Sequence, residues 1–361
     1  MSAGRVLQLL GPSTGGIRRH VAYLSDQLRA AGWEVGIAGP AGVLDDLDHV
    51  VPIPDGTDPR GVLRSGRALR PLLPSYDLVH AHGLKPGWIA ALGSRRGRVA
   101  HTPVVLSVHN LVLDEVAGRS ATTLRRLEGW LPGRVDATIA ISGEVARRFA
   151  GSRGAVGIHV IPPAGPPPAP TRSRDEVRAA LGLGPADDLV VTAARLHPQK
   201  GLYVLLDAAE LAVEQRPGLR WFVFGDGPLR DPLRAEIARR GLSGVVHLAG
   251  TRPDVDDELA AADAVVVTSQ WESGPLVVLE ALGLGRPVVS TRVGLAPDVI
   301  DESRGRVVDV GAAPDLADAL VAVLRDPPDA PDGVSGSFAR FQPAALASAV
   351  EAVYREVLTT R

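Results

Sequence analysis

The feature that most constrains the fold of this chain is an alternation of short apolar runs with segments of helical periodicity. A short apolar run between turn residues is typical of a buried strand, and a 3.6-residue repeat is typical of an amphipathic helix. Strands that alternate with helices form βαβ units, and this predicts an α/β fold with doubly wound parallel sheets. We expect strands at residues 6–10, 34–38, 78–82, 104–108, 138–141, 189–193, 221–224, 245–248, 264–268 and 287–290. Helices are expected between them, for example at residues 17–31, 202–215, 229–240 and 276–284.

A proline-rich segment marks the expected boundary between two domains, a number that suits a chain of 361 residues. Residues 161–170 contain six prolines. Proline has no N–H to donate and a fixed φ, so the segment can form neither a helix nor a central strand. We therefore predict a stiff linker between a first domain, 1–165, and a second domain, 166–340, with a final helix inside residues 341–361. If two such domains face each other, ligands bind in a cleft at the carboxyl ends of their strands.

Composition excludes several classes of protein. The absence of cysteine excludes disulfide scaffolds, thiolate catalysis and cysteine zinc sites. A formal net charge of −2 argues against a general nucleic-acid binder, although residues 1–165 carry +6 and residues 166–361 carry −8. The chain starts without a signal-peptide pattern, and no run reaches the roughly 20 apolar residues of a membrane helix. We expect a cytoplasmic protein.

The segment after residues 264–268 has the strongest signs of a binding site. Ser273-Gly274-Pro275 resembles a helix start, with a capping candidate, a flexible residue and a proline in the first turn. The first-turn N–H groups of Leu276 and Val277 then suit a phosphate. Glu272 and Glu280 would accept hydrogen bonds from sugar hydroxyls. A capped helix with a solvated Glu280 explains the same pattern.

A second loop, at residues 192–202, carries Arg195 and Lys200 between an expected strand and an expected helix. The arginine fork and the lysine point charge together suit a diphosphate. Two surface cations on a loop are the plainer alternative, and the Walker P-loop pattern is absent. Gly225 and Gly227 form a third strand-to-helix turn, where glycines permit close backbone approach to a base or a ribose, or simply a tight turn.

In the first half, Gly15 and Gly16 open a helix, where backbone amides can approach a phosphate. His80 and His82 share one face of a strand. His109 follows another strand, and we interpret it as a neutral hydrogen-bonding residue. Neither cysteine nor an H-E-x-x-H pattern is present, so we expect no metal and no cofactor. A packed or capping role remains the alternative for each histidine.

Residues 119–134 interleave arginines with leucines and a tryptophan. Such a segment would suit an anionic membrane surface, and an ordinary helix with a solvated basic side explains it equally simply.

The order of these motifs resembles a known family. Arg195 and Lys200-Gly201, then Gly225-Asp226-Gly227-Pro228, then Glu272 and Glu280 with seven residues between them, resemble the carboxyl-terminal domain of retaining GT-B glycosyltransferases of family GT4. The first helix start, His109 and the final helix are similar to the same family, so the resemblance covers nearly the whole chain. It departs from the family at 161–165, which replace a frequent Ile-Pro-Asn-Gly, and at Ser-Gly-Pro after Glu272, which replaces a frequent Gly-Phe-Gly.

The resemblance implies two Rossmann-like domains with parallel sheets that face a central cleft, an acceptor domain first and a donor domain second. It implies a nucleotide-diphosphate sugar as the donor, and transfer of a hexosyl unit with retention to an unidentified acceptor, lipid-linked or small. Arg195 and Lys200 would contact the diphosphate, Glu272 and His109 the sugar, and these four residues would be catalytic. The other donor-binding residues implied are Gly15, Gly16, Gly225, Gly227, Ser273, Gly274, Leu276, Val277 and Glu280.

The sequence is also compatible with other functions. A nucleotide-sugar epimerase has the same architecture, and a non-catalytic sugar-nucleotide binding protein would have the same pocket. A nicotinamide dehydrogenase is disfavoured because the full G-x-G-x-x-G is missing. Contact with the inner face of a membrane is a further possibility, because the first half is basic.

Overall fold

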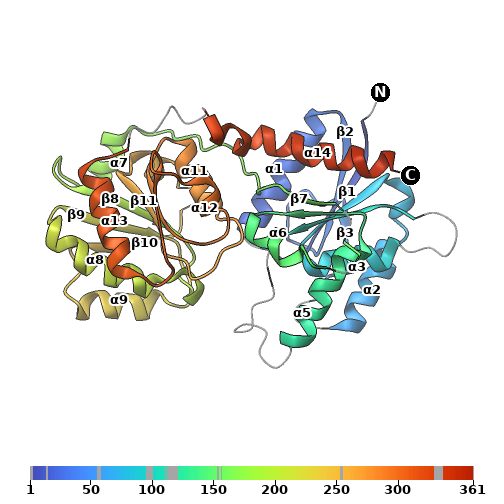
Figure 1. Cartoon of the computed structure of the whole chain (residues 1–361), viewed down its shortest axis with the longest axis horizontal. Helices are drawn as coiled ribbons and strands as arrows, with labels where there is room; N and C mark the ends of the chain where they lie inside the picture. The colour runs from blue at the N-terminus through green and yellow to red at the C-terminus, as the bar shows by residue number, and fades with distance from the viewer. Residues whose placement is uncertain are drawn as a thin grey trace. The chain divides into compact units, whose positions relative to one another are not determined.

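Two parallel β-sheets, one in each half of the chain, organise the protein in this computed structural model (Figure 1). The structure describes residues 3–13, 15–54, 58–94, 101–109, 111, 121–152, 154–155, 157–252, 255–328 and 336–360. The chain forms two compact units: Met1–Pro166 with Arg340–Arg361, and Pro167–Ala339.

The first unit has a seven-stranded sheet in the order β3-β2-β1-β4-β5-β6-β7, and all of its strand pairs are parallel. The central strands β4 and β5 are buried along their whole length, because helices cover both faces of a parallel sheet. This burial explains why these strands read as short apolar runs. The strands are β1 Gly4–Leu10, β2 Trp33–Gly39, β3 His49–Val50, β4 Leu78–His82, β5 Val104–Val108, β6 Ala137–Ala140 and β7 Ile158–Val160.

The helices of the first unit include one from the far end of the chain. Helix α14 lies beside α1 (red and blue in Figure 1), and its Tyr354 is fully buried against Trp33, with ring centroids 5.3 Å apart. Trp33 Nε1 also donates to Glu351 at 3.0 Å. These contacts make α14 part of the first core. The helices are α1 Gly16–Ala30, α2 Pro59–Leu69, α3 Leu84–Ser94, α5 Ala121–Trp130, α6 Gly143–Phe149 and α14 Pro343–Thr359, with short 3-10 turns at Leu73–Ser75, Leu131–Arg134 and Gly336–Phe341.

The second unit has a six-stranded parallel sheet in the order β10-β9-β8-β11-β12-β13. Its strands are β8 Asp188–Ala193, β9 Leu219–Phe224, β10 Val246–Gly250, β11 Ala264–Val267, β12 Val288–Thr291 and β13 Gly305–Val308. Its helices are α7 Arg174–Ala180, α8 Leu202–Gln215, α9 Arg230–Arg239, α10 Asp256–Ala261, α11 Leu276–Gly283, α12 Ala296–Val299 and α13 Ala313–Arg325, with a 3-10 turn at Pro198–Lys200.

The predicted α/β architecture is confirmed, and each of the ten predicted strands overlaps an observed one. Three observed strands were not predicted: β3, β7 and β13. Strands β3 and β7 have only two and three residues, and β13 begins with glycine and arginine, so none of them shows an apolar run. Short strands at or near a sheet edge form because a neighbouring strand is already in place, which residue order does not reveal.

Residues 161–170, predicted as a stiff linker between the domains, begin inside the core of the first unit. Ile161 and Ala164 are buried in the first core together with residues of α14. Chain contacts place the boundary between units after Pro166. Proline prevents regular structure, as expected, but it does not prevent burial, because an extended segment can still pack its side chains.

Within the described part of the chain, no helix is both long and apolar enough to cross a membrane.

Candidate functional site

Hydrogen bonds join two loops of the second unit at the carboxyl ends of the neighbouring strands β8 and β11. Thr268 Oγ1 donates to the carbonyl of Lys200 at 2.7 Å, and Gln199 Nε2 donates to the carbonyl of Trp271 at 2.9 Å. The Gln270 amide donates to the carbonyl of Gln199 at 2.8 Å. The two loops therefore form one connected structure at the edge where doubly wound sheets bind ligands.

An ion pair lies between these loops. The Lys200 ammonium donates to Glu272 Oε1, and Ser269 Oγ donates to the same oxygen at 2.9 Å. The side chains are only 18% and 13% exposed, so the charges act in a medium less polar than water. The structure thus brings together two residues that the sequence predicted to share a site, 72 positions apart.

Arg195 lies on the same loop as Lys200, but the two side chains differ in exposure. It is exposed, and within the described residues it has no ion-pair partner. Its backbone position is fixed by its neighbour, because Leu196 is buried and its amide donates to the carbonyl of Asp226 at 3.0 Å. A guanidinium on an anchored loop suits an anionic ligand.

The glycines of the third loop are required by neighbouring backbone. Gly225 has a φ of +144°, and a Cβ there would lie 2.0 Å from the carbonyl oxygen of Ala194. A Cβ at Gly227 would lie 2.5 Å from the carbonyl oxygen of Leu196. Both glycines therefore let the loop after β9 pack on the loop that carries Arg195, and their contact with a nucleotide stays a prediction.

The helix start after Glu272 differs from the prediction. Helix α11 begins at Leu276, and its N-cap is Pro275, which has no side chain to accept a hydrogen bond. Ser273, the expected capping residue, lies too far before the helix for that role and is buried. Helix geometry leaves the amides of Leu276 and Val277 without acceptors inside the helix.

Glu280, expected on the ligand face of α11, is only 7% exposed, so the plainer alternative of a solvated carboxylate is wrong. Gly274, between the buried Ser273 and Pro275, is half-buried. The sequence interpretation overlooked Gly294, whose φ is +52°. A Cβ there would lie 2.7 Å from the carbonyl oxygens of both Glu272 and Ser273, so Gly294 allows the loop after β12 to support the Glu272 loop.

In the first unit, Gly15 is the N-cap of α1 and Gly16 is its first residue. Gly15 has a φ of +96°, which favours glycine, and no other atom would lie within 4 Å of a Cβ at that position. Both residues are exposed. The helix therefore starts with open backbone, as an anion site requires.

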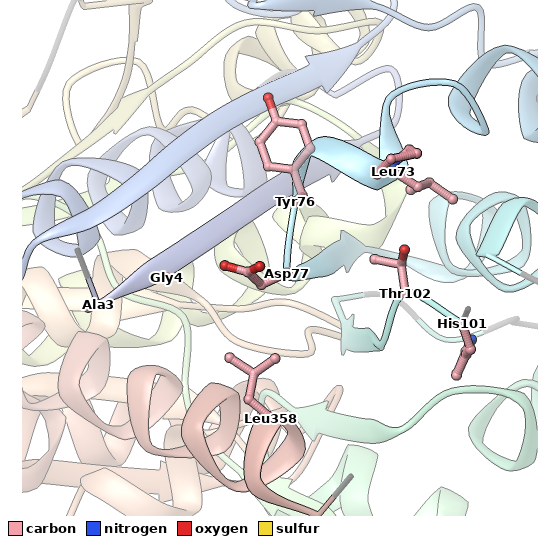
Figure 2. Close-up of a pocket in the computed structure, with 9 residues that line it drawn as sticks. Ala3, Gly4, Leu73, Tyr76, Asp77, His101, Thr102 and Leu358 are labelled. Carbon is pink, nitrogen blue, oxygen red and sulfur yellow. The ribbon is translucent and has the colours of Figure 1, made fainter. Parts of the chain in front are cut away.

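A pocket of about 600 Å³ lies at the edge of the first sheet where its strands begin (Figure 2). Gly4, Asp77 and Thr102, at or just before the starts of β1, β4 and β5, contribute to its wall. His101 beside it is held by Asp136 at 3.0 Å. Doubly wound sheets bind ligands at the carboxyl ends of their strands, so we do not assign this pocket to the site.

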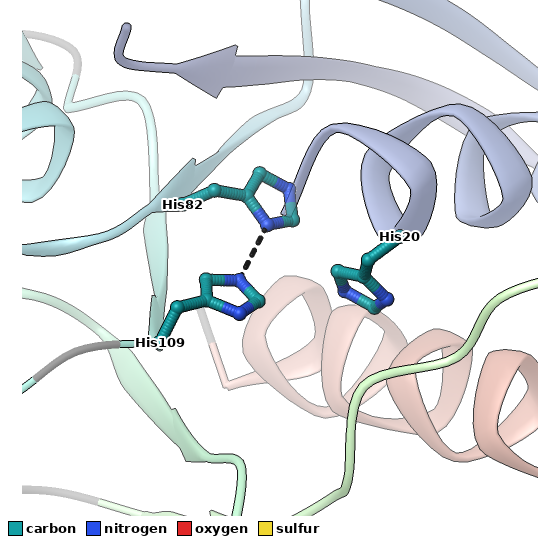
Figure 3. A group of neighbouring side chains, drawn as sticks. All are labelled: His20, His82 and His109. Atoms are coloured by element: carbon teal, nitrogen blue, oxygen red, sulfur yellow. Dashed lines mark hydrogen bonds between the residues drawn. The ribbon is translucent and has the colours of Figure 1, made fainter. Parts of the chain in front are cut away.

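Four histidines cluster at the carboxyl ends of β4 and β5 and on α1, and all are buried. His82 Nδ1 and His109 Nε2 are 3.1 Å apart, and Figure 3 shows His20 beside this pair. His20 Nδ1 lies 2.9 Å from both the amide nitrogen and the carbonyl oxygen of Ala164. His80, next to His82, completes the cluster, with ring centroids 4.1 Å apart.

Burial keeps these imidazoles neutral. Desolvation lowers the pKa of His20 to about 4, although its hydrogen bond to Ala164 partly opposes this shift. Burial also lowers the pKa values of His80, His82 and His109 well below the usual value, and the neighbouring histidines lower them further. At neutral pH, each ring therefore carries one N–H and one acceptor nitrogen.

One ring nitrogen each from His20, His82 and His109 lies within 4.8 Å of the others. The facing nitrogens of His82 and His109 are 3.1 Å apart while their ring centroids are 5.4 Å apart, so the nitrogens lie close to the line between the rings. This head-on arrangement is that of a hydrogen bond. Two metal ligands would instead direct their lone pairs toward a common third point.

Several polar residues of the two sites were not predicted. In the second unit these are Gln199 and Ser269, together with the glycine Gly294. In the first unit they are Gln8, Ser107 and Tyr354, all buried. A signal was present for Gln8, which interrupts an otherwise apolar strand and therefore needs a buried hydrogen-bond partner.

Comparison with known proteins agrees with this architecture. Residues 14–164 match the family model described as Glycosyltransferase Family 4, and residues 173–333 match the one described as Glycosyl transferases group 1. The D-inositol 3-phosphate glycosyltransferase of Nocardia farcinica is 33% identical over 309 residues, which cover 80% of this chain and 67% of that protein. The lipopolysaccharide core biosynthesis mannosyltransferase LpsB of Rhizobium meliloti is 27% identical over 336 residues, which cover 88% of this chain and 95% of that protein.

Among solved structures, Anabaena HepE in complex with UDP and glucose is similar with a TM-score of 0.79 and 22% identity, over 98% of this chain and 99% of that one. Two parallel-sheet α/β units with this match define a GT-B fold and an enzyme of the glycosyltransferase class. The chain belongs to the group 1, family 4 glycosyltransferases.

Proposed function

We propose that this enzyme transfers a hexosyl unit from a nucleoside diphosphate sugar to an acceptor hydroxyl, with retention of the anomeric configuration. The observation that carries the proposal is the joined pair of loops that holds Lys200 and Glu272 together, with exposed Arg195 on the same structure. HepE, which has a similar fold, has been solved with UDP and glucose and with UDP-glucose, and this supports a donor of that class.

In this proposal, Arg195 and Lys200 bind the diphosphate. The hard step is the departure of a diphosphate, which gathers negative charge on the leaving oxygen. Fixed cations stabilise that charge without reorganising at the moment of reaction. The open amides of Leu276 and Val277, with the backbone of Ser273 and Gly274, add hydrogen-bond donors to the phosphates. Gly15 and Gly16 of the first unit offer backbone amides of the same kind.

The Lys200–Glu272 pair would change on donor binding. A diphosphate brings more negative charge than one carboxylate, so the ammonium would shift toward it. Glu272 would keep the hydrogen bond from Ser269 and use its other lone pairs for hydroxyls of the donor sugar. The pair thus keeps both charges oriented before the ligand arrives.

Other residues would bind the rest of the donor. Glu280 on α11 would accept hydrogen bonds from ribose hydroxyls, and the turn at Gly225 and Gly227 would lie against the nucleoside. His109 would contact the sugar. Its ring is only 3% exposed, so a ligand would have to displace what covers it.

Retention follows if the acceptor attacks from the face that the diphosphate leaves. The bond between the anomeric carbon and the diphosphate oxygen breaks, and a bond to the acceptor oxygen forms on the same side. The acceptor proton goes to the departing phosphate oxygen. This route needs no protein nucleophile, and the two cations supply the charge stabilisation.

The experiment starts with a thermal-shift screen of UDP-, GDP- and ADP-sugars, followed by assays of nucleoside diphosphate release with and without acceptors. The proposal expects a stabilising nucleotide sugar that is consumed rapidly only with an acceptor, and an NMR coupling constant that shows a retained anomer. Epimerised donor without an acceptor, or binding without any turnover, would replace the proposal with one of the two alternatives.

We propose further that the acceptor is lipid-linked and meets the first unit at a groove of about 540 Å³ that is lined by residues of α2, α3 and α5. The groove is predominantly apolar, and exposed arginines stand on two of the helices that form it. Apolar surface beside positive charge suits the chain and the anionic headgroup of a lipid at the inner face of a membrane. Apolar lining residues include Val62, Leu63, Leu84, Trp88, Leu124 and Leu127; the exposed arginines are Arg60, Arg64, Arg67, Arg125 and Arg126. Arg119, part of the basic stretch noted in the sequence, lies outside the described residues.

Cosedimentation with vesicles of neutral lipid, or of neutral and anionic lipid together, tests this second proposal. Leu127→Asp places a charge in the groove, and Leu211→Asp changes an equally exposed leucine of the other unit (38% and 40% exposed). We expect binding to anionic vesicles that falls several-fold only in Leu127→Asp. Equal binding by both variants would contradict the proposal.

A further inference from the structure

Six buried side chains of the first unit form one unbroken line of hydrogen bonds. The line runs from β5 through β4, β1 and α14, then returns through β4 to β5. It consists of His109, His82, Gln8, Tyr354, His80 and Ser107, with successive distances of 3.1, 2.7, 3.1, 2.6 and 2.7 Å. Each of these side chains is at most 3% exposed, so water cannot replace a missing partner and every bond must have one donor and one acceptor.

Gln8 sets the direction of the line toward His109. Its Oε1 can only accept, so His82 must donate from Nε2. A neutral imidazole has one N–H, so His82 Nδ1 is an acceptor. The bond between His82 and His109 therefore takes its hydrogen from His109 Nε2.

Tyr354 on the last helix continues the alternation of donors and acceptors. Gln8 Nε2 donates to Tyr354 Oη, so the hydroxyl hydrogen of Tyr354 is used for the next bond. It goes to His80 Nδ1. His80 then carries its hydrogen on Nε2 and donates to Ser107 Oγ. All five bonds are satisfied, and no donor faces a donor.

We propose that this hydrogen-bonded chain holds His109 as the Nε2–H tautomer and makes Gln8 and Tyr354 positioning residues for it. Nδ1 of His109 is then the acceptor nitrogen, so a hydroxyl group that meets it must donate the hydrogen bond. This last step rests on the proposed contact of His109 with the donor sugar. Tyr354 lies on α14, so a residue of the last helix helps to determine the tautomer of His109, which stands 245 positions earlier in the sequence.

The opposite tautomer requires a collective reversal. If the Gln8 amide turned over, Nε2 would face His82 and Oε1 would face Tyr354. Every bond would then reverse, and His109, His82 and His80 would all become Nδ1–H. Neither His82 nor His109 can change alone without placing two donors or two acceptors in contact. Tyr354 also packs against Trp33, and this contact limits how far the hydrogen-bonded side chains can move to relieve such a mismatch.

Nitrogen-15 NMR of histidine-labelled protein reads each tautomer directly, without substrate. Replacing one histidine at a time assigns the signals. We expect Nε2–H for His109, His82 and His80 at pH 7.5. A wild-type His109 in the Nδ1–H form, or the three rings in different tautomers, would overturn the proposal.

Two variants test the direction of the chain. In Gln8→Glu, both carboxylate oxygens accept, so Tyr354 donates to the introduced carboxylate and His80 alone changes to Nδ1–H. In Tyr354→Phe, the Gln8 amide loses the acceptor that orients it, and His109 becomes a mixture of tautomers. Tyr23→Phe is the matched control, because Tyr23 packs partly buried against the same core. An unchanged His109 signal in folded Tyr354→Phe would contradict the proposal.

The kinetic result separates this inference from the proposed function. We expect kcat in Tyr354→Phe to fall about tenfold, the effect of one lost hydrogen bond, with unchanged nucleotide affinity. The Tyr23→Phe control should keep the wild-type kcat. Equal kcat in both variants would overturn the positioning role. If the wild type turns over no nucleotide sugar, the proposed function fails, while the tautomers still decide the inference.

Discussion

Lys200→Ala is the most direct test of the proposed donor site. In the structure, the Lys200 side chain is 18% exposed and its ammonium contacts Glu272, which also accepts a hydrogen bond from Ser269. The substitution removes one of the two cations proposed to bind the diphosphate. It leaves the carboxylate with its serine partner, so the Glu272 loop keeps one of its anchors.

The expected loss is large because the charge acts in a partly enclosed site. Two unit charges about 4 Å apart interact by about 4 kcal/mol at an effective dielectric constant of about 20. A loss of that size in the transition state lowers the rate by about 10³-fold. Breaking the charged hydrogen bond to Glu272 should cost about 1–3 kcal/mol of folding stability. The protein should therefore stay folded at room temperature while turnover almost disappears.

The assay measures the initial rate of nucleoside diphosphate release with the donor identified by the screen, together with Tm. Arg234→Ala is the matched control, because Arg234 is an exposed cation of the same unit whose only ion pair in the described residues is with Asp231. A rate of Lys200→Ala within threefold of the wild type would refute the reasoning.

Three further predictions concern stability. Gly225→Ala should lower the free energy of unfolding, measured in urea, by about 3–5 kcal/mol, because its Cβ would lie 2.0 Å from the Ala194 oxygen. Gly241 also has a positive φ but no atom within 4 Å of a Cβ, so Gly241→Ala should lower it by only about 1 kcal/mol. Equal effects of the two substitutions would contradict the predicted clash. The pKa of His20 is lowered to about 4 by burial, so the unfolded state binds more protons between about pH 4 and 6.5, and this ring alone should lower stability by about 3 kcal/mol as pH decreases through that window. The pKa values of His80, His82 and His109 are lowered in the same direction and should add to the fall; a flat stability profile in urea titrations at pH 7.5, 5.5 and 4.5 would contradict the burial of these rings. Ser173→Ala removes the capping box of α7 and should cost about 1 kcal/mol, which a Tm measurement against wild type would detect.

Much of the fold could be predicted from residue order because parallel sheets impose a simple local pattern. A strand covered on both faces must be apolar along its length, so β4 and β5 were predicted with their observed bounds. The predicted bounds of helix α8 also match the observed ones. The short strands β7 and β13 contain too few consecutive apolar residues to be predicted from residue order. They form because a neighbouring strand is already present for them to pair with.

The second-unit loops were predictable for a related reason. Glycine, proline and charged residues concentrate where a buried strand ends, so Lys200 and Glu272 could be assigned to the same edge of a sheet. Their direct ion pair could not be predicted. It depends on Thr268 and Gln199, whose hydrogen bonds set the distance between two loops that are far apart in sequence.

The histidine chain shows what residue order can predict and what only three-dimensional packing determines. His80, His82 and His109 were recognised as polar residues at strand ends, but their protonation could not be inferred. It depends on Gln8 from the first strand and Tyr354 from the last helix, which only three-dimensional packing brings together. Residue order decides which segments become strands and which residues stand at their ends, because those preferences are local. Only the folded chain decides which partner each buried polar group meets, because that depends on contacts between distant segments.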